Sequence, residues 1–272
     1  MVGLTELYEE WLSKRFVLFE MVKCIKGHEL SMIARRTEGK PRPVIRYLFA
    51  SSVDYLEKHI KRFVTGDNLM NFYISCAELK DIPIFSYNLF ERRKTPQYKE
   101  FNDNYQNYVT AYSFFMDFDG KEDFNKCLEE TKEMKKILEE MKVPHYVLNS
   151  SFKGFHIIIP SQYMPNKKVE ELLRDINEVI SNIKEIYDFS TMDTSIGDLK
   201  RLRKLPYSPV NDGSIALPLT DSQLANFTPE MVKIENVLKD IKIMNRGLLL
   251  RTGELTELEL KENVIKFFKE FS

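Results

Sequence analysis

The chain has 272 residues, of which 43% are hydrophobic and 12% aromatic, enough to bury a sizeable core in one large domain or two small ones. Its formal net charge of −1 excludes a protein whose whole surface is a basic footprint for nucleic acid, so any contact with a polyanion must be local. Charged residues interrupt every apolar run before it reaches membrane-spanning length, and no basic leader precedes an apolar core. We therefore expect no membrane association and a cytoplasmic location.

The cysteines are few and far apart. Cys24, Cys76 and Cys127 each lie in a segment with apolar periodicity. This distribution supports neither a disulfide framework nor a zinc site, and it favours buried, reduced thiols.

The N-terminal part of the chain begins with a helix and continues with a βαβ pattern. Apolar residues recur at helical spacing over 4–22. A turn at 38–43 precedes an expected strand at 44–50, a helix opened by a serine cap at 52–64 and a second strand at 70–79. The polar segment 91–104 is expected to be a loop.

The remaining elements follow in the order strand, helix, hairpin and helix. The run AYSFFMDFDG predicts a strand that ends near 119, and one apolar face predicts a helix at 124–141. A hairpin at 145–160, a helix at 169–187 and a short strand at 214–219 come next. Two helices close the chain at 228–241 and 254–271. With no repeat and no low-complexity linker, the pattern favours one compact α/β unit with helices at both ends.

The strand that ends in DFD carries the first functional signal. Residues i and i+2 of a strand face the same way, so Asp117 and Asp119 project side by side while Phe118 faces the opposite side. A divalent cation would relieve the repulsion between them, and their oxygen ligands suit Mg²⁺ or Mn²⁺. The alternative is structural, with Asp119-Gly120 forming an ordinary turn and Asp117 capping the next helix.

The hairpin sequence SFKGFH carries the second signal. Ser151, Lys153 and His156 bring a hydroxyl, an ammonium and an imidazole to one small volume, together with backbone N–H groups. These groups are donors for phosphate oxygens. Taken alone, they also fit a core histidine and a solvated turn lysine.

The third signal is the segment MDTSIGDLKRLRKLPYS. Asp193 follows a hydrophobic residue and precedes Arg201 and Arg203, so a third carboxylate has cations close behind it. Asp198 competes for this role, although its place beside a glycine favours a loop or cap position. The basic run 200–204 could also be a solvated face. Three carboxylates, the donor set and the arginine pair together fit a two-metal phosphoryl-transfer site.

In the order and spacing of these motifs the chain resembles the archaeo-eukaryotic primase superfamily: catalytic small subunits, primase-polymerases and the polymerase domains of some end-joining ligases. The matching features are DFD after an apolar strand, then SFKGFH, then MD with RLRKLPYS behind it. The earlier segments RRTEGKPRPVIRYLFASSVDYL and FYISCAEL also fit the way such subunits begin. The resemblance covers about residues 34 to 220, and only the three motifs are specific.

The resemblance implies a nucleotidyltransferase that makes or extends primers from nucleoside triphosphates. Asp117, Asp119 and Asp193 would be the catalytic ligands of two Mg²⁺ or Mn²⁺ ions. A primer or first-nucleotide 3′-hydroxyl would attack the α-phosphate of the incoming nucleotide and release pyrophosphate. A single-stranded DNA template and ribo- or deoxynucleoside triphosphates would be the partners, with a larger primase subunit as a further one.

The resemblance also assigns residues around the nucleotide. Ser151 and His156 would hold the triphosphate, and Lys153 and Gly154 would shape the loop around it. Arg203 and Arg201 would support the phosphates or the template, and Ser208 would continue the nucleotide pocket. Many relatives carry a histidine where this chain reads SPVN, so that contact is missing or is supplied by Asn211. Many relatives also carry a zinc-binding insertion, and the three scattered cysteines of this chain exclude a four-cysteine version of it. The resemblance therefore does not imply primer initiation without a partner, whereas phosphoryl transfer itself does not depend on this insertion.

The implied fold is α+β, with an N-terminal α/β part packed on an RRM-like sheet and the site in the cleft between them. We expect an N-terminal helical extension at 1–33, a catalytic domain at 34–225 and a C-terminal helical segment at 226–272. Three alternatives stay open. A metal-dependent nuclease would not need the SxKGxH turn, a non-catalytic RRM-like binding module would not need Asp193, and a degenerate partner of another polymerase would have lost a carboxylate.

Overall fold

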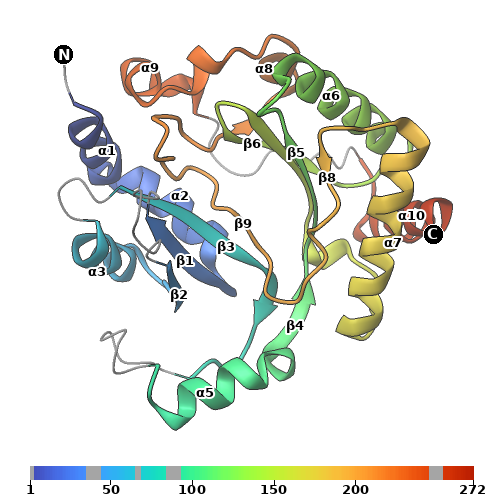
Figure 1. Ribbon diagram of the computed structural model, residues 1–272, viewed down its shortest axis with the longest axis horizontal. Helices are drawn as coiled ribbons and strands as arrows, with labels where there is room; N and C mark the ends of the chain where they lie inside the picture. The colour runs from blue at the N-terminus through green and yellow to red at the C-terminus, as the bar shows by residue number, and fades with distance from the viewer. Residues whose placement is uncertain (1–2, 35–43, 65–68, 84–92, 245–253) are drawn as a thin grey trace.

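The computed structural model describes residues 3–34, 44–64, 69–83, 93–244 and 254–272. Two five-stranded antiparallel sheets form its centre, and helices cover them on the outside (Figure 1). The turn expected at 38–43 lies outside the described residues. The expected α+β class, with two packed sheets and helices at both ends, is confirmed.

The first sheet has the order β2-β1-β3-β4, and β9 pairs with β3 beside β4. Its strands are β1 (His28–Ala34), β2 (Val44–Leu48), β3 (Met70–Leu79), β4 (Val109–Tyr112) and β9 (Leu202–Lys204). The predicted strand-helix-strand unit is present as β2, α3 and β3. However, β1 lies between the two strands and is antiparallel to both.

The second sheet has the order β10-β6-β7-β5-β8. Its strands are β5 (Phe114–Asp119), β6 (Tyr146–Ser151), β7 (Gly154–Ile159), β8 (Met192–Asp193) and β10 (Pro218–Leu219). Strands β6 and β7 form the predicted hairpin, and β5 pairs with β7 along its whole length.

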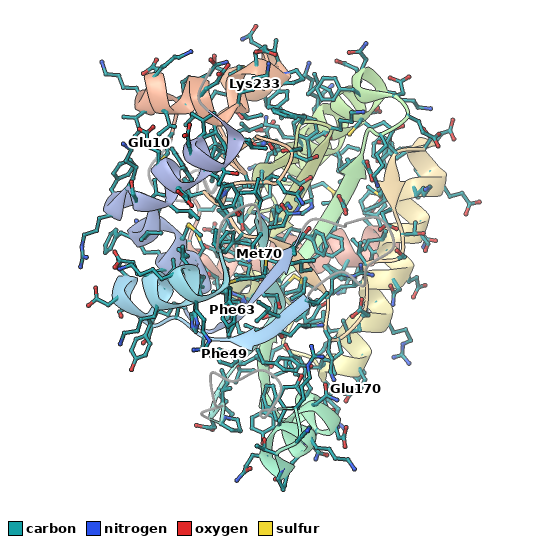
Figure 2. All side chains as sticks on the ribbon, turned by 60° about the vertical axis from the view of Figure 1, so that its left-hand side comes forward. Glu10, Phe49, Phe63, Met70, Glu170 and Lys233 are labelled. Atoms are coloured by element: carbon teal, nitrogen blue, oxygen red, sulfur yellow. The ribbon has the colours of Figure 1, made fainter. Side chains whose placement is uncertain are left out.

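Helices flank both sheets. Their bounds are α1 (Leu4–Ser13), α2 (Arg15–Ile25), α3 (Val53–Phe63), α5 (Pro96–Asp103), α6 (Phe124–Glu140), α7 (Val169–Tyr187), α8 (Asp221–Ala225), α9 (Ile234–Lys239) and α10 (Glu257–Phe271). Helices α1, α2 and α3 lie beside the first sheet, while α6, α7 and α10 lie on the outer side of the second (Figure 1). Helix α1, which carries Glu10, contacts α9, which follows Lys233; both residues are labelled in Figure 2. No helix in the described ranges is long and apolar enough to cross a membrane.

Three local features differ from the sequence expectations. The helix predicted at 4–22 is interrupted at Lys14, whose extended backbone ends α1 and begins α2. Residues 28–33, placed in the N-terminal helical extension, belong to β1, which is buried on both faces and therefore lacks a period-two pattern. The segment expected to be a loop contains α5, where Thr95 caps the first turn and Pro96 starts it.

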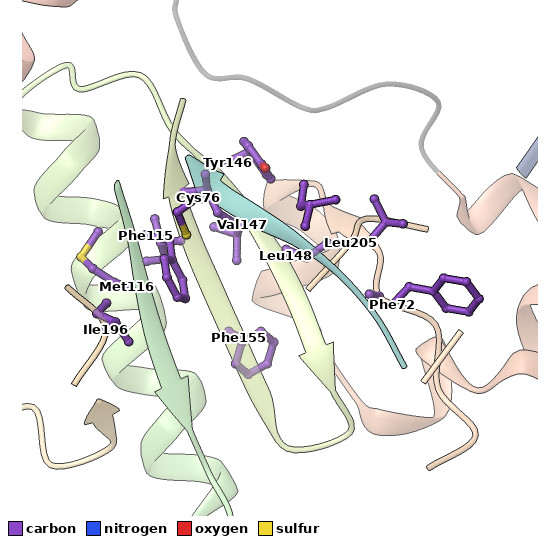
Figure 3. Packing of buried hydrophobic residues seen from close by; sticks show 14 of the residues in the cluster. Phe72, Cys76, Phe115, Met116, Tyr146, Val147, Leu148, Phe155, Ile196 and Leu205 are labelled. Atoms are coloured by element: carbon purple, nitrogen blue, oxygen red, sulfur yellow. The ribbon is translucent and has the colours of Figure 1, made fainter. Parts of the chain in front are cut away.

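One hydrophobic core joins the two sheets. Phe72 and Cys76 of β3 and Tyr146 and Leu148 of β6 belong to the same buried cluster (Figure 3). On the outer side of the second sheet, Phe118 packs against Phe189 with ring centroids 5.9 Å apart. Because alternate residues of a strand face opposite sides, Asp117 and Asp119 face away from that aromatic contact.

Candidate active site

Three of the side chains predicted to form the site lie in one row across the second sheet. Asp117 of β5 is the direct register partner of Asp193 on β8 and of His156 on β7. Direct cross-strand partners share a face, with Cα atoms about 4.5–5.5 Å apart. The fold therefore brings together two carboxylates and an imidazole that are far apart in the sequence, and Asp119 extends the row along β5.

The β6–β7 hairpin closes one end of this row. Ser151 pairs with Gly154, so Phe152 and Lys153 form a two-residue connection. The backbone N–H of Gly120 donates to the carbonyl oxygen of Lys153 at 2.7 Å, which ties the hairpin to the end of β5. A Cβ atom on Gly154 would lie 3.1 Å from the carbonyl oxygen of Phe118 and 2.7 Å from Ser150 Oγ, so the close approach of these strands requires a glycine.

A cleft of about 440 Å³ opens in front of Asp117, Asp119 and His156, whereas Asp193 is not among its described lining residues. The second sheet and its hairpin contribute Asp117, Asp119, Ser151, Lys153, Gly154 and His156. The opposite wall comes from the first sheet and a following loop, through Asn71, Tyr73, Lys204, Val210, Asn211 and Asp212. The cleft thus lies between the two sheets, where the resemblance predicted the site.

The charge of Asp117 is balanced by neighbouring cations. Burial raises the pKa of Asp117, but the interactions with His156 and the charges of Lys121 and Arg201 lower it more, so the net pKa lies below its ordinary value. His156 Nε2 lies 3.4 Å from Asp117 Oδ1. The carboxylate is therefore held in its charged form at the cleft wall.

The other two carboxylates are occupied by local contacts. Asp119 forms an ion pair with the ammonium of Lys121 and accepts a hydrogen bond from the Lys121 backbone at 3.1 Å. Asp193 accepts from the backbone N–H and the hydroxyl of Ser195, both at 2.8 Å. The hydrogen bond with Asp119 and its charge, together with the charges of Asp117 and Asp193, raise the pKa of Lys121. Lys121 thus supplies a positive charge to all three carboxylates.

The donor set matches a hard divalent cation, although the side chains do not converge on one point. In the described ranges, no group of three His, Cys, Asp or Glu side chains has a metal-holding arrangement. Asp117, Asp119 and Asp193 share one face and offer carboxylate oxygens, which are the ligands that Mg²⁺ and Mn²⁺ prefer. Their charges already act on one cation, the ammonium group of Lys121. Rotation of the partly exposed Asp119 away from Lys121 would be needed to ligate such an ion.

The residues predicted to support the nucleotide divide into two sets. Ser151, Lys153, Gly154 and His156 line the cleft, whereas Arg201, Arg203 and Ser208 do not. Arg201 Nε lies 2.8 Å from Asp198 Oδ2, and Ser208 is fully buried with its hydroxyl bonded to the Leu205 carbonyl oxygen. Arg203 faces a second cavity, described below.

Sequence reasoning missed several cleft residues. Lys204 carries the cation that β9 presents to the cleft, and its Nζ lies 3.2 Å from the Tyr73 hydroxyl and 4.4 Å from the Tyr73 ring centroid. The alternation of a strand could have separated Lys204 from Arg203, but β9 has only three residues. Asn211, considered as the substitute for a family histidine, lines the cleft. Lys121 directly follows DFDG in the sequence, and this closeness to Asp117 and Asp119 could have identified it as a cleft residue.

Comparisons of the whole chain with protein-family models and with curated proteins found no match. The structure is similar to the polymerase domain of ligase D from Mycobacterium tuberculosis in complex with DNA, with a TM-score of 0.56 and 11% sequence identity over 88% of this chain and 89% of that chain. The catalytic domain of primase RepB′ in complex with initiator DNA aligns with a TM-score of 0.41 and 9% identity over 85% of this chain and 96% of that one. The first similarity shows that the chain has the fold of the archaeo-eukaryotic primase-polymerases, as the order of its motifs predicted.

Proposed function

We propose that this protein is a template-dependent nucleotidyltransferase that makes or extends primers from nucleoside triphosphates. The observation that carries the proposal is the row of Asp193, Asp117 and His156, which adjoins a cleft whose other wall holds Lys204. The row provides acidic groups for cations, and the hairpin and Lys204 provide donors for phosphates. The shared fold with a polymerase domain supports the same reading.

The proposed reaction joins a 3′-hydroxyl oxygen to the α-phosphorus of the incoming nucleotide. The bond between the α-phosphorus and the bridging oxygen breaks, pyrophosphate leaves and the hydroxyl proton passes to solvent. Two Mg²⁺ or Mn²⁺ ions held by Asp117, Asp119 and Asp193 would supply activation of the hydroxyl and neutralisation of charge on the phosphates. The protein contributes mainly position and electrostatics, as in other phosphoryl transfers.

His156 is suited to hold a triphosphate oxygen. Its side chain is buried, Nε2 faces Asp117, and among the described residues Nδ1 has no hydrogen-bond partner. Buried polar atoms are normally paired, so an unpaired one at a cleft wall points to a ligand. We assign His156 to the triphosphate, together with Ser151 and Lys153 of the hairpin and Gly154 as the residue that permits its shape.

Lys204 strengthens the proposed phosphate side of the cleft. Its side chain is buried, and no described carboxylate forms an ion pair with it, which leaves its charge available to a triphosphate. We assign Arg201 a supporting electrostatic role, since its charge acts on Asp117. A single-stranded DNA template would occupy the outer cleft, and a larger primase subunit is a further proposed partner.

The test is primer extension and de novo synthesis on single-stranded DNA with Mg²⁺ or Mn²⁺, comparing the wild type with Asp117→Asn. We expect the variant to lose more than about a hundredfold in rate, since even outer-shell partners of metals commonly cost 10- to 100-fold. Asp54→Asn on α3 is the matched control, because it makes the same chemical change at an exposed helix start. Equal activity in Asp117→Asn and the wild type would contradict the proposal.

Other classes of protein give different results in the same assay. A nuclease would shorten the template or the primer in a metal-dependent way. A non-catalytic RRM-like module or a degenerate polymerase partner would bind DNA without incorporating nucleotides, and its binding of a triphosphate would not depend on Mn²⁺ and Asp117. Either pattern would overturn the nucleotidyltransferase assignment.

A further inference from the structure

A second cavity lies where β9 and the end of α2 meet the second sheet, and it is separate from the cleft. It has a volume of about 200 Å³, and none of the described residues lines both spaces. Its walls are formed by Lys23, Cys24, Lys26, His28, Glu78, Ser113, Tyr146, Ile158, Pro160, Ser161, Gln162 and Arg203. We refer to it as the Arg203 pocket.

Arg203 is the most unusual group in this pocket. Its side chain is 5% exposed, and Nη1 donates to the Tyr146 hydroxyl at 3.0 Å. Nε is buried without a hydrogen-bond partner, and among the described residues no carboxylate forms an ion pair with this guanidinium. A buried charge without a counter-ion is costly, so the guanidinium is poised to receive an anion.

The thiols, the phenol and the imidazole around Arg203 do not supply the missing negative charge. Burial raises the pKa of Cys24, Cys76 and Tyr146 to about 12 each, so both thiols and the phenol are neutral at pH 7. Burial and the nearby Arg203 charge lower the pKa of His28 to about 4, so its ring is neutral as well. These groups surround the guanidinium with dipoles rather than charges.

The pocket lining also carries more positive than negative charge. Lys23 and Lys26 add two ammonium groups, and Lys23 pairs with Glu20 outside the lining at 2.6 Å. Glu78 is the acidic residue among the described lining residues, and its carboxylate accepts a hydrogen bond from the Ser161 hydroxyl. The volume is below the roughly 300–1,000 Å³ of sites for drug-sized ligands, which limits the occupant to a small group.

We propose that the Arg203 pocket binds a phosphate-class oxyanion, either inorganic phosphate or the phosphate group of a mononucleotide. The guanidinium presents donors in the fork geometry that suits phosphate oxygens. Lys26 attracts the anion at the mouth, and Glu78 weakens binding by repulsion. The site is separate from the proposed polymerase cleft, because none of the described residues that line the Arg203 pocket also lines the cleft.

The test is calorimetric titration of inorganic phosphate into the full chain, without divalent metal and in a buffer free of phosphate and sulfate. We expect one saturable site in the wild type and in Lys204→Met, which removes a cation from the cleft but not from the pocket. Arg203→Met should weaken binding by at least about tenfold, the value of one charge-assisted hydrogen bond. Saturable binding that is unchanged in Arg203→Met, or no binding in the wild type, would overturn the proposal.

Two further variants keep the test decisive if Arg203→Met does not fold. Lys26→Gln at the exposed mouth should weaken phosphate binding about threefold, and Glu78→Gln should strengthen it by a similar factor. Lys136→Gln on the exposed face of α6 is the matched control for loss of a lysine charge and should change nothing. Equal affinities in all three variants would contradict the assignment.

The source of the oxyanion is distinguished by a second set of ligands. A 5′-mononucleotide that binds more tightly than inorganic phosphate, while the parent nucleoside does not bind, identifies a nucleotide phosphate as the occupant. Equal affinity of the mononucleotide and inorganic phosphate identifies the free ion. Binding of the nucleoside alone with the same affinity as the mononucleotide would show that the phosphate is not recognised.

Discussion

Two buried or partly buried arginines of the first sheet have opposite surroundings. Arg46 on β2 donates through Nε and Nη2 to the two carboxylate oxygens of Glu29 at 2.7 and 3.0 Å, and Nη2 also donates to the Lys200 carbonyl oxygen at 3.0 Å. Arg203 on β9 meets a neutral phenol and has an unpaired Nε. The guanidinium of Arg46 is thus paired with a carboxylate of the protein, whereas that of Arg203 can accept an anionic ligand.

This difference separates a structural arginine from a binding one. Glu29 is fully buried and also accepts from the Ser31 hydroxyl and the Tyr47 backbone, so the Arg46 pair belongs to a satisfied network. Such a network fixes a conformation and has no need of a partner from outside. An unpaired buried guanidinium at a cavity wall instead gains stability when an anion enters.

The largest effect is expected when the Arg46 network is broken. Glu29→Gln leaves the Arg46 charge without its partner and should lower the free energy of unfolding by about 3–5 kcal/mol. Urea unfolding measures the change. Glu57→Gln, at an ion pair on α3 with exposed partners, is the control and should cost less than about 1 kcal/mol. A loss in Glu29→Gln no larger than the control would remove the contrast between the two arginines.

The next effect concerns pH and the Arg203 side of the comparison. The pKa of His28 is about 4 in the folded protein and about 6.5 when unfolded, so the folded state disfavours the charged ring. Stability from this group is complete above pH 6.5 and is lost as the pH falls toward 4, by about 3 kcal/mol. His28→Asn, which cannot take up a proton, should flatten this part of the stability profile. An unchanged profile would show that His28 does not control it.

Binding in the cleft should depend on the other cation of β9. Lys204→Met should weaken Mn²⁺-dependent binding of a nucleoside triphosphate by about 10- to 100-fold, because a charge-assisted hydrogen bond contributes about 1.5–3 kcal/mol. Equilibrium binding measures the loss, with Lys136→Met as the control at an exposed site on α6. Phosphate binding at the Arg203 pocket should persist in the same variant. Equal triphosphate affinity in Lys204→Met and the wild type would remove Lys204 from the phosphate side.

The smallest effect is expected at the hairpin beside the cleft. Gly154→Ala should destabilise the fold by about 1–2 kcal/mol, since Ser150 can rotate away but the Phe118 carbonyl oxygen belongs to the paired strand. Urea unfolding measures this loss. Gly3→Ala is the matched control, because its new methyl group would meet its nearest atom at 3.9 Å. No loss at Gly154 would mean that the strands can separate without cost, and the Arg203 pocket should be unaffected in either case.

Local sequence patterns predicted much of the second sheet. The apolar run ending in Asp119, the hairpin around Lys153 and the helices on either side are all present. These elements have strong periodicity or a short turn, so local residues determine them. The α+β class and the primase-polymerase fold followed from the order of three motifs.

Pairing over long distances was harder to predict. The position of β1 between β2 and β3 depends on contacts with segments up to 50 residues away, and burial on both faces hides its alternation. The opposite directions of Arg203 and Lys204 depend on how β9 meets the edge of β3. The motif RLRK shows which residues are cationic, but it does not show which cavity each one faces.

Strand β9 would couple the two proposed ligand sites thermodynamically. Its neighbouring residues Arg203 and Lys204 line the Arg203 pocket and the cleft, respectively. Two anionic ligands would therefore bind side chains of the same short backbone segment. Any factor by which phosphate changes the affinity for a triphosphate must equal the factor by which the triphosphate changes the affinity for phosphate. Measuring one affinity in the presence of the other ligand would therefore give the coupling free energy across a single strand.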